Sequence, residues 1–368
     1  MNIDSRPRVL LLSAYRADSH AVWADALVAT FPDIEWLRFE LPGRHFRWRI
    51  RGNPISWLEA LEGVRADAIV ATSMVDLATL RGLHPPLSAL PALYYFHENQ
   101  FAYPVGEHQV RSIEPQMVQI YGALSAGRIA FNSAFNRDSF LDGLRALLRR
   151  MPDAVPPGVP ERLADRARIL PVPVPPPRRP EGATPERDPD LILWNHRWEY
   201  DKRPELFAEA LERLAARGRG FRLALLGPRP KPPPEALQRI RERFGTNIVA
   251  DGRLPRAEYD ALLWRAGIVV STTAHEFQGL SMLEASGAGA RPLVPDALCY
   301  PEQYPPEYRY PAGDPEALAA RLDTWLTDGL PPPADVRALE PDTLLPAWTR
   351  ALEELTGRPL SPAPATRT

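Results

Sequence analysis

The chain reads Ser271-Thr-Thr-Ala-His275-Glu276-Phe-Gln-Gly279-Leu-Ser281-Met-Leu-Glu284-Ala-Ser286 where an apolar run, residues 267–271, gives way to a polar loop. The apolar run predicts a short buried strand, residues 275–279 predict a loop, and the residues from Leu280 onward predict a helix. Strand, loop and helix in this order form the repeating unit of open parallel sheets, which bind ligands at the carboxyl ends of their strands. The stretch therefore predicts an α/β fold with a ligand site on this loop.

The same stretch carries groups suited to an anion and to hydroxyls. Ser281 is expected to cap the helix, whose free N–H groups and positive dipole end suit a diphosphate. Glu276 and Glu284 are expected to flank that anion without touching each other, and a carboxylate can hold two neighbouring hydroxyls of a sugar or a ribose. Gly279 permits close approach of the backbone to a ligand. A lone glutamate, or His275 alone, is more often an ordinary loop residue; the joint pattern favours a site.

Composition limits the class of protein. A chain of 368 residues is long enough for two domains. Its 44 basic and 46 acidic residues give a net charge of −2, so a polyanionic partner has to be met by a local patch. Cys299 is the only cysteine, which excludes disulfides within the chain and suits a reducing compartment. The apolar run at residues 9–12 is too short for a signal peptide or a membrane span, and these features together predict a cytoplasmic location.

Predicted strands and helices alternate along most of the chain. We expect strands at residues 9–13, 34–39, 68–72, 92–96, 128–132, 191–195, 221–226, 247–250, 268–271 and 292–295, with helices between most of them and two more helices at 315–326 and 343–355. This alternation predicts two Rossmann-like, doubly wound parallel sheets facing a cleft. The expected parts are an acceptor domain 1–175, a proline-rich linker 176–189, a donor domain 190–335, and a returning helix with a frayed tail, 336–368.

Two features of the first domain point to an acceptor. His97-Glu98-Asn99-Gln100 follows an apolar strand directly, and His97 is either a site residue or a structural histidine. Arginines and aromatic residues interleave in Arg44-His-Phe-Arg47-Trp48-Arg49-Ile-Arg51. Such a mixture either pairs with phosphates and stacks on bases, or forms an exposed amphipathic turn. Ser19 is expected to cap the helix that follows the first strand.

Several chemistries lack their signatures in this sequence. No GxGxxG follows either first strand, and zinc spacings, a GxSxG elbow and a P-loop are missing. Arg197 and Lys202 follow the first strand of the second domain, where together they can neutralise a diphosphate. Sugar-nucleotide chemistry is what these observations leave.

The spacing of Arg197 and Lys202, followed by Glu276 and Glu284 with a glycine between, resembles the retaining glycosyltransferases of the GT-B fold. This resemblance implies that Arg197 and Lys202 hold the donor diphosphate, that Glu284 binds ribose hydroxyls, and that Glu276 faces the donor sugar. The remaining implied donor contacts are His275, Gly279, Leu280 and Ser281.

Longer strings narrow the resemblance to the tRNA-queuosine α-mannosyltransferases. They are Tyr95-Phe-His97-Glu98-Asn99-Gln100 with Tyr103-Pro104-Val105, Phe131-Asn132-Ser133 with Phe135-Asn136 and Ser139-Phe140, Trp194 with His196-Arg197-Trp198-Glu199 and Asp201-Lys202, His275-Glu276-Phe277 with Met282-Leu283-Glu284-Ala285, Tyr300-Pro301-Glu302, and Glu307-Tyr308. The resemblance spans nearly the whole chain. It implies transfer of mannose from GDP-mannose to the cyclopentene diol of queuosine in a tRNA anticodon, with retention and without a bound metal or cofactor.

Site roles follow from this resemblance. The implied catalytic residues are His97, Glu276, Arg197 and Lys202, and the implied acceptor-binding residues are Ser19, His20, Arg47, Trp48, Glu98, Asn99, Gln100, Asn132 and Ser133. The expected partners are a nucleotide sugar and a tRNA that carries queuosine, and no membrane or protein partner is indicated. The family's first loop carries two glycines before Ser-His, where this chain has Ala17 and Asp18, a change expected to alter the approach of acceptor or donor.

Other functions remain open at the level of sequence. A GT-B enzyme with another nucleotide sugar and a small-molecule, lipid or polysaccharide acceptor has the same donor pattern. A glycoside hydrolase is a weaker alternative, because it needs carboxylates that face each other across the bond. A non-catalytic protein that binds sugar nucleotide or RNA belongs to a different class altogether.

Overall fold

The computed structural model describes residues 6–103, 112–180, 182 and 186–363. Two compact units make up the chain: Met1–Pro173 with Pro341–Thr366 form the first, and Val174–Glu340 form the second. Pro104 and Val105, which belong to one of the family-like strings, lie outside the described residues.

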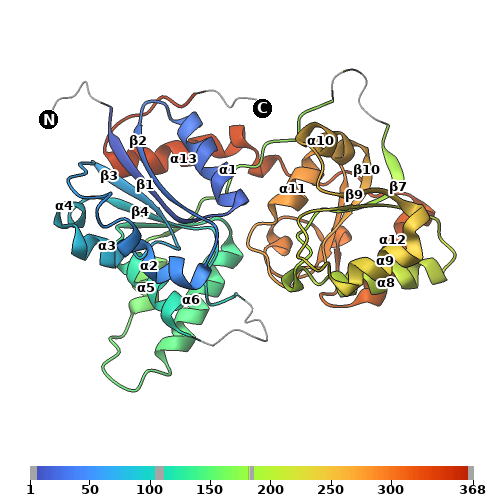
Figure 1. The fold of residues 1–368 in the computed structure, drawn as a ribbon, viewed down its shortest axis with the longest axis horizontal. Coiled ribbons are helices and arrows are strands. Elements are labelled where there is room, and N and C mark those ends of the chain that lie inside the picture. Colours follow the sequence, from blue (N-terminus) through green and yellow to red (C-terminus); the bar gives the residue numbers. More distant parts are fainter. Residues whose placement is uncertain (1–5, 104–111, 181, 183–185, 364–368) are drawn as a thin grey trace. The chain divides into compact units, whose positions relative to one another are not determined.

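The first unit is a six-stranded parallel sheet with strand order β2-β1-β3-β4-β5-β6. Apolar runs such as β3 and β4 are buried along their whole length, as expected of strands covered by helices on both faces (Figure 1). Its strands are β1 (Arg8–Arg16), β2 (Glu35–Pro42), β3 (Ala68–Thr72), β4 (Ala92–Phe96), β5 (Arg128–Phe131) and β6 (Ala167–Ile169). Its helices are α1 (Asp18–Thr30), α2 (Phe46–Ser56), α3 (Leu77–Leu83), α4 (Pro85–Ser88), α5 (Glu114–Ser125), α6 (Ala134–Leu148), α7 (Val159–Ala164) and α13 (Pro341–Thr356).

The last helix, α13, packs onto this first unit. The indole N–H of Trp348 donates to the carbonyl of Pro171 at 2.9 Å, and its ring lies 6.0 Å from that of Trp23. The residues after α13 are also held, because the Ala363 N–H donates to the carbonyl of Thr30 at 2.8 Å. Residues 364–368, which belong to the tail expected to fray, lie outside the described residues.

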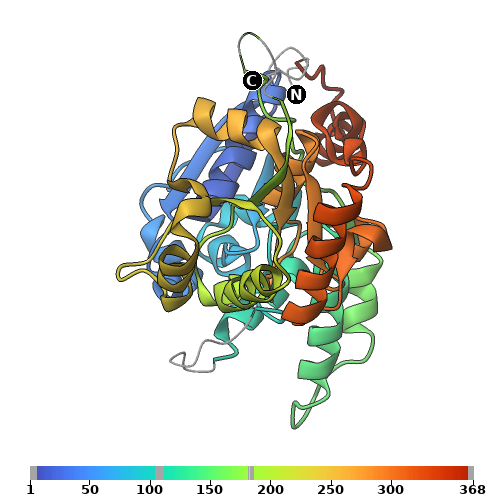
Figure 2. The same cartoon turned by 90° about the vertical axis from the view of Figure 1, so that its right-hand side faces the viewer.

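The second unit repeats the architecture with the strand order β12-β11-β10-β7-β8-β9. Helices again cover both faces, with α8 and α12 side by side on one of them (Figure 2). The strands are β7 (Asp188–Trp194), β8 (Arg222–Leu226), β9 (Ile248–Gly252), β10 (Ala266–Val270), β11 (Arg291–Pro295) and β12 (Arg309–Tyr310). The α-helices are α8 (Pro204–Ala216), α9 (Glu235–Phe244), α10 (Arg256–Arg265), α11 (Leu280–Gly287) and α12 (Pro315–Asp328), and the short 3-10 helices are η1 (Tyr200–Lys202), η2 (Gly245–Asn247), η3 (Tyr300–Glu302), η4 (Pro306–Tyr308) and η5 (Arg337–Leu339).

Two parallel α/β sheets confirm the predicted fold class, and the local predictions that failed have physical reasons. The arginine-rich segment forms helix α2 and not a turn, because Asn53 bonds it to the neighbouring loop: its Nδ2 donates to the carbonyl of Met74 at 3.2 Å, and its Oδ1 accepts from the Asp76 N–H at 3.1 Å. Ser19 does not cap α1, because that helix starts one residue earlier and Ala17 takes the N-cap position without a side-chain bond.

The length and composition of the helices are also relevant to whether this chain could cross a membrane. None of the helices in the described part of the chain combines the length and the apolar character that a membrane crossing requires. A cytoplasmic location stays a prediction.

Candidate functional site

The predicted donor loops lie at the topological switch point of the second sheet. β7 is the first strand of this unit, and it pairs with β10 on one side and β8 on the other. The loops after β7 and β10 therefore leave the sheet next to each other, at the position where open α/β sheets bind ligands. Thr272 joins the two loops, because its hydroxyl donates to the carbonyl of Lys202 at 2.8 Å.

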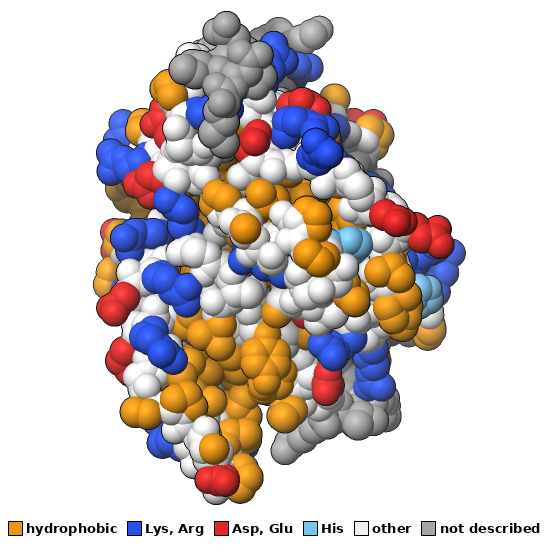
Figure 3. Space-filling view, turned by 90° about the vertical axis from the view of Figure 1, so that its left-hand side faces the viewer, with side chains coloured by type: hydrophobic (Ala, Val, Ile, Leu, Met, Phe, Trp, Pro, Cys, Tyr) orange, Lys and Arg blue, Asp and Glu red, His pale blue; other side chains and the backbone are white. Residues whose placement is uncertain are grey.

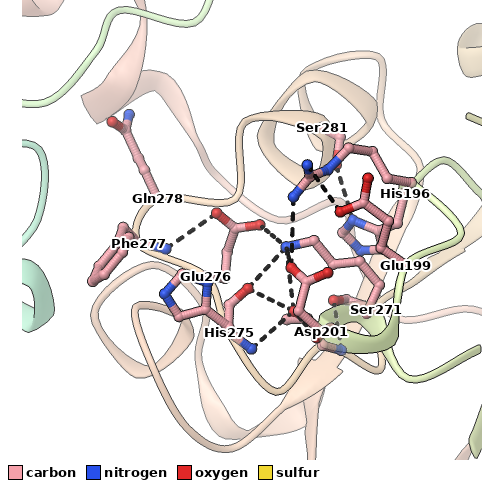
Figure 4. Close-up of polar contacts among 12 residues, drawn as sticks. His196, Glu199, Asp201, Ser271, His275, Glu276, Phe277, Gln278 and Ser281 are labelled. Atoms are coloured by element: carbon pink, nitrogen blue, oxygen red, sulfur yellow. Dashed lines mark hydrogen bonds and ion pairs between the residues drawn. The ribbon is translucent and has the colours of Figure 1, made fainter. Parts of the chain in front are cut away.

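Lys202 is buried, and its polar partners Asp201, His275 and Glu276 lie close together in Figure 4. Its Nζ donates to the carbonyl of His275 at 2.8 Å and to Glu276 Oε2 at 3.2 Å, and it lies 3.4 Å from both Asp201 Oδ2 and Thr273 Oγ1. Long charged side chains are rarely buried unless paired, and here one ammonium serves two carboxylates. The structure thus brings together the lysine and Glu276, which are 74 positions apart in the sequence.

Electrostatics keep Glu276 ionised. Burial raises the pKa of this carboxyl, but the Lys202 ammonium and a hydrogen bond from the Gly279 backbone outweigh burial and lower the pKa to about 2. Its Oε1 also accepts from the Phe277 N–H at 3.1 Å. Glu276 is therefore a fixed carboxylate acceptor for hydroxyls at any physiological pH.

Two histidines line the same loops in neutral form. Burial, with a further contribution from the charge of Lys202, lowers the pKa of His196 to about 3 and that of His275 to about 4. Neutral imidazoles hydrogen-bond without adding charge next to the lysine. His275 lies edge-on to Phe277, with 4.7 Å between ring centroids.

Arg197 is the accessible cation of the site. Its side chain is 46% exposed, lies 3.1 Å from Glu199 Oε2 and 3.6 Å from Asp201 Oδ2, and stands at the outer side of the buried lysine. A guanidinium so placed can exchange a solvated carboxylate for a phosphate. Arg197, Lys202 and Glu276 belong to one connected cluster, and Glu284 lies on the adjoining helix.

The start of α11 differs from its prediction. Gly279 takes the N-cap position with a left-handed backbone, φ 67°, and no side chain caps the helix. Ser281 is the second residue of the helix, and its hydroxyl lies 3.5 Å from His196 Nδ1. Leu280 is the first helical residue. The N–H groups of Met282 and Leu283 donate to the carbonyl of Gly279, so those of Leu280 and Ser281 are the ones that another acceptor, such as a phosphate, can take up.

Glu284 is held by residues that sequence reasoning did not single out. Arg256 donates to its Oε1 at 2.5 Å and Tyr259 donates to its Oε2 at 3.0 Å, both from α10. Asn195, at the tip of β7, donates to the hydroxyl of Tyr259 at 3.3 Å and to the carbonyl of Ser281 at 2.9 Å. The i, i+3 spacing of Arg256 and Tyr259 was the only sequence signal, and it does not reveal what that face of the helix meets.

In the first unit, His97 sits in an aromatic box at the carboxyl edge of the sheet. His20 stacks on it with 4.3 Å between centroids, and Trp23 and Tyr95 meet it edge-on at 4.6 and 4.7 Å. Burial and the neighbouring His20 lower the pKa of His97 well below 6.5, and its Nε2 has no hydrogen-bond partner among the described residues. His97 is thus a neutral imidazole with one unused nitrogen, which favours a site histidine.

His20 also has a defined ring orientation. Its Nδ1 lies 2.8 Å from the carbonyl of Tyr15, which can only accept, so Nδ1 carries the hydrogen. Burial lowers the pKa of His20 to about 4, and the ring stays neutral at pH 7. The two stacked imidazoles are therefore uncharged together, without mutual repulsion.

Three predicted acceptor residues support loops in this structure. Asn99 is fully buried and donates to Asn136 Oδ1 at 2.9 Å, Asn132 donates to the carbonyl of His97 at 2.9 Å, and Ser133 caps α6 by accepting from the Asn136 N–H at 3.0 Å. These bonds give all three residues a structural role that requires no contact with the acceptor substrate. Direct contact between them and an acceptor stays a prediction.

The remaining predicted acceptor residues reach the surface. Ser19 is exposed, Glu98 and Gln100 are half-buried, and Arg47 and Trp48 are exposed on α2. Ala17, where the family-like loop would carry glycine, has an ordinary extended backbone with φ −75°, so no glycine is needed there for conformation. Among the residues that the structure describes, no group of His, Cys, Asp or Glu is arranged to hold a metal ion.

Solved structures share this architecture across nearly the whole chain. The Anabaena protein HepE in complex with UDP matches with a TM-score of 0.68 and 12% identity, covering 94% of this chain and 99% of its own. Sucrose-phosphate synthase from Thermosynechococcus elongatus matches with a TM-score of 0.66 and 14% identity over 96% and 99% of the two chains. The lipopolysaccharide outer core galactosyltransferase WaaB matches with a TM-score of 0.65 and 13% identity over 94% and 99%.

Family models agree with the fold. Residues 189–328 match the model of the glycosyl transferases group 1, the part that contains Arg197, Lys202, Glu276 and Glu284. The chain is a glycosyltransferase with the GT-B fold of two Rossmann-like domains, as the sequence predicted.

The particular family is defined by the first unit together with the whole chain. Residues 8–174 match the model of the tRNA-queuosine alpha-mannosyltransferase N-terminal domain. The tRNA-queuosine alpha-mannosyltransferase of Drosophila melanogaster is 34% identical over 316 residues, which are 83% of this chain and 84% of that protein. The chain belongs to the tRNA-queuosine alpha-mannosyltransferase family, and the predicted resemblance is confirmed.

Proposed function

We propose that this glycosyltransferase transfers mannose from GDP-mannose to queuosine in a tRNA anticodon, with retention of configuration at the anomeric carbon. The observation that carries the donor half is the cluster of Arg197, Lys202 and Glu276 at the switch point of the second sheet. The acceptor half is supported by the family relation, and above all by the match of the first unit to the family's own N-terminal model. HepE, which shares the fold, is a structure with UDP.

In the proposed reaction the protein works mainly on the leaving group. Cleavage of the bond between mannose and the diphosphate puts negative charge on the departing phosphate. Arg197, Lys202 and the uncapped start of α11 interact with that charge more strongly than with the intact donor, which lowers the barrier. Donor binding is expected to draw Nζ of Lys202 away from the Thr273 hydroxyl, which lies 3.4 Å away, while the pairing with Glu276 persists.

The acceptor hydroxyl attacks from the face that the diphosphate leaves. The new C–O bond forms as the old one breaks, and the hydroxyl proton passes to an oxygen of the departing phosphate, so no protein nucleophile is required. Glu276 holds sugar hydroxyls as an acceptor-only carboxylate. His97 offers its unused Nε2 to a hydroxyl, because burial keeps the ring neutral.

A product assay tests the proposal. The protein is incubated with tRNA that contains queuosine and with labelled GDP-mannose, and the tRNA is digested and analysed for mannosyl-queuosine. Label in that nucleoside, with an α linkage, supports the proposal. Label that enters only with another nucleotide sugar, or only another acceptor, contradicts it, and so does binding of donor without product. tRNA with guanosine in place of queuosine is the matched control.

Replacing Tyr259 by phenylalanine is expected to weaken GDP binding about five- to tenfold. Tyr259 orients Glu284, the proposed partner of the ribose hydroxyls, and a hydrogen bond to a charged group is worth about 1.5–3 kcal/mol before water replaces part of it. Calorimetric titration with GDP measures the change.

A GDP analogue without the ribose hydroxyls serves as the control for this prediction. With 2′,3′-dideoxy-GDP, which lacks the hydroxyls, wild type and Tyr259→Phe are expected to bind equally. Tyr308→Phe removes a tyrosine hydroxyl that donates to the carbonyl of Pro332 at 2.6 Å, and it should leave GDP affinity unchanged. An equal loss of affinity for both nucleotides would show a general structural defect and contradict the role of Tyr259.

A further inference from the structure

The exposed side of α2 combines positive charge with an open aromatic ring. We call Arg44, His45, Arg47 and Trp48 the basic-aromatic face; all four are exposed, at and just before the start of the helix. From Leu41 to Leu58 the sequence contains no acidic residue, although the chain as a whole is slightly acidic. This is a local patch of the kind that a polyanion requires of a protein without a basic net charge.

The indole of Trp48 lies flat against the backbone of its own helix. A Cβ atom at Gly52 would be 2.5 Å from the indole atom Cε2, so only glycine leaves room for the ring at this position. Trp48 is nevertheless 51% exposed. One face of the ring is thus covered by the helix and the other is open, which is the geometry of a stacking platform for an unpaired base.

The arginines at the amino end are available for phosphates. Arg51, further along the helix, is paired with Asp76 at 2.6 Å and Glu114 at 3.0 Å, but Arg44 and Arg47 form no ion pair with any acidic group in the described part of the chain. Their charge is therefore not neutralised locally, and guanidinium groups are well matched to phosphate oxygens.

The basic-aromatic face adjoins the predicted acceptor residues of the same unit. The ring of Phe46 meets Tyr15 edge-on with 6.2 Å between centroids, and a Cβ at Gly43 would lie 2.8 Å from the carbonyl oxygen of Arg16. The loop that α2 contacts in this way leads within a few residues to His20, which stacks on His97. A chain bound along α2 is thus led toward the carboxyl edge of the sheet.

We propose that the basic-aromatic face is the docking surface for the anticodon loop of the tRNA, with the indole of Trp48 stacked on an unpaired base and with Arg44 and Arg47 on phosphates of the loop. This inference rests on the proposed function, since it names how the same acceptor is held. Single-stranded loops are the parts of RNA whose bases are free to stack on aromatic side chains.

A second exposed feature does not share this chemistry. Hydrophobic side chains gather over the lower part of the face seen in Figure 3, where Lys and Arg side chains are few. The exposed apolar residues of the first unit include Ile113, Tyr121 and Leu124. Without cations such a surface offers little to a phosphate backbone, and it therefore does not compete with α2 as the site for RNA.

Direct RNA binding tests the inference without depending on transfer. The probe is a fluorescent anticodon stem-loop that contains queuosine, and its anisotropy gives the Kd. Trp48→Ala is expected to raise the Kd about tenfold and Trp48→Phe about twofold, because a phenyl ring still stacks. The double variant Arg44→Glu, Arg47→Glu is expected to raise the Kd about 100-fold at low salt. The slope of log Kd against log salt concentration should fall by about two, the loss of about two phosphate contacts.

Matched controls carry the same chemical changes elsewhere on this unit. Arg65→Glu with Arg150→Glu reverses two exposed arginines that also lack an ion pair among the described residues, away from α2, and should change the Kd less than twofold. Leu83→Ala removes an apolar side chain of similar exposure, 48%, and should have no effect. Melting temperatures within about 2 °C of wild type establish that the variants fold.

The outcomes separate this inference from the proposed function. If the Trp48 and arginine variants bind the stem-loop with wild-type affinity, the docking surface is overturned, even if mannosyl transfer is observed. Loss of affinity in these variants, but not in the controls, supports the docking surface, even if the transferred sugar proves to be different. Failure of wild type to bind the stem-loop overturns it outright. An equal loss in the control pair shows that overall charge decides binding, and it also overturns the assignment to α2.

Discussion

Replacing Lys202 by methionine is expected to reduce kcat by about 100- to 1,000-fold, the effect of removing one charge-stabilising donor from a transition state. Methionine keeps an unbranched, apolar stem of similar length and removes the ammonium. That ammonium pairs with Glu276 at 3.2 Å, and it also lies 3.4 Å from Asp201. The loss should appear in kcat at saturating GDP-mannose, because the interaction strengthens as the phosphate departs.

Removal of this buried charge also affects folding. Glu276 and Asp201 would remain with less compensation, and breaking a buried pair costs about 3–5 kcal/mol when the remaining charge stays in place. A lower melting temperature is therefore expected, and activity is compared below it. Arg197→Ala serves as the second variant, because its side chain is 46% exposed and its loss leaves the fold intact; we expect a decrease in turnover of about 100-fold.

The matched control is the next cation in the sequence. Arg203→Met removes a half-exposed charge that lies 3.7 Å from Glu205 and has no assigned contact with the donor. Its kcat is expected to stay within about twofold of wild type, the ordinary result of losing a surface ion pair. Turnover of Arg197→Ala and Lys202→Met within fivefold of wild type would refute the role of these cations in stabilising the leaving phosphate.

The loops of the donor site show how much of the site the sequence alone predicts. An apolar run followed by polar residues is a local pattern, so the strand, loop and helix around residues 266–287 were predictable. The sequence placed Lys202 and Glu276 on two loops at strand ends, but it assigned them separate roles, on the diphosphate and on the sugar, and did not predict their ion pair. The predicted capping role of Ser281 was wrong, because the serine rule ignores the left-handed residue at Gly279 that starts the helix earlier.

Contacts that depend on how two helices pack against each other could not be predicted from the sequence. Arg256 and Tyr259 meet Glu284 only because α10 lies against α11, and no sequence pattern specifies that contact. Helix α2 was missed because Gly52 and Pro54 oppose a helix locally, and it forms through tertiary bonds of Asn53.

Polar residues at strand ends illustrate a different limit. Sequence placed Asn99 and Asn132 at the correct edge of the sheet, yet it could not separate a group that faces a ligand from one that holds the loop. In the structure their amides bond to neighbouring loop and helix atoms. His97 differs, because its Nε2 is buried and has no partner among the described residues, and only a three-dimensional accounting of hydrogen bonds reveals that difference.

Acidification from pH 7 to pH 5 is expected to lower the free energy of unfolding of each unit by about 3–4 kcal/mol through buried histidines. His20 and His97 lie in the first unit, and His196 and His275 lie in the second. Burial lowers the pKa of His20 and His275 to about 4 and that of His196 to about 3, and it places the pKa of His97 well below 6.5. In the unfolded chain all four titrate near 6.5.

The sign follows from proton uptake. Below about pH 6.5 the unfolded chain binds a proton on each histidine, whereas the folded unit does not until the pH falls to about 4, so acid favours unfolding. The stabilisation is complete above the unfolded pKa and is lost as the pH falls from about 6.5 toward 4. Each extra proton contributes a slope of about 1.4 kcal/mol per pH unit. The loss of the Glu276 charge acts in the same direction, but in a separate window below about pH 4.5.

Urea unfolding at pH 7, 6 and 5, followed by tryptophan fluorescence, measures this dependence. His20→Phe retains a ring that can stack on His97 but cannot take up a proton. This variant is expected to be less stable than wild type at pH 7, because the bond to Tyr15 is lost, and yet to lose about half as much stability as wild type in the first unit on acidification. A free energy of unfolding that stays constant between pH 7 and pH 5 would mean that these imidazoles have the same pKa in the folded and the unfolded protein, near 6.5. That result would remove the basis for a neutral His97 beside the acceptor, because burial would then not hold the ring in its uncharged form.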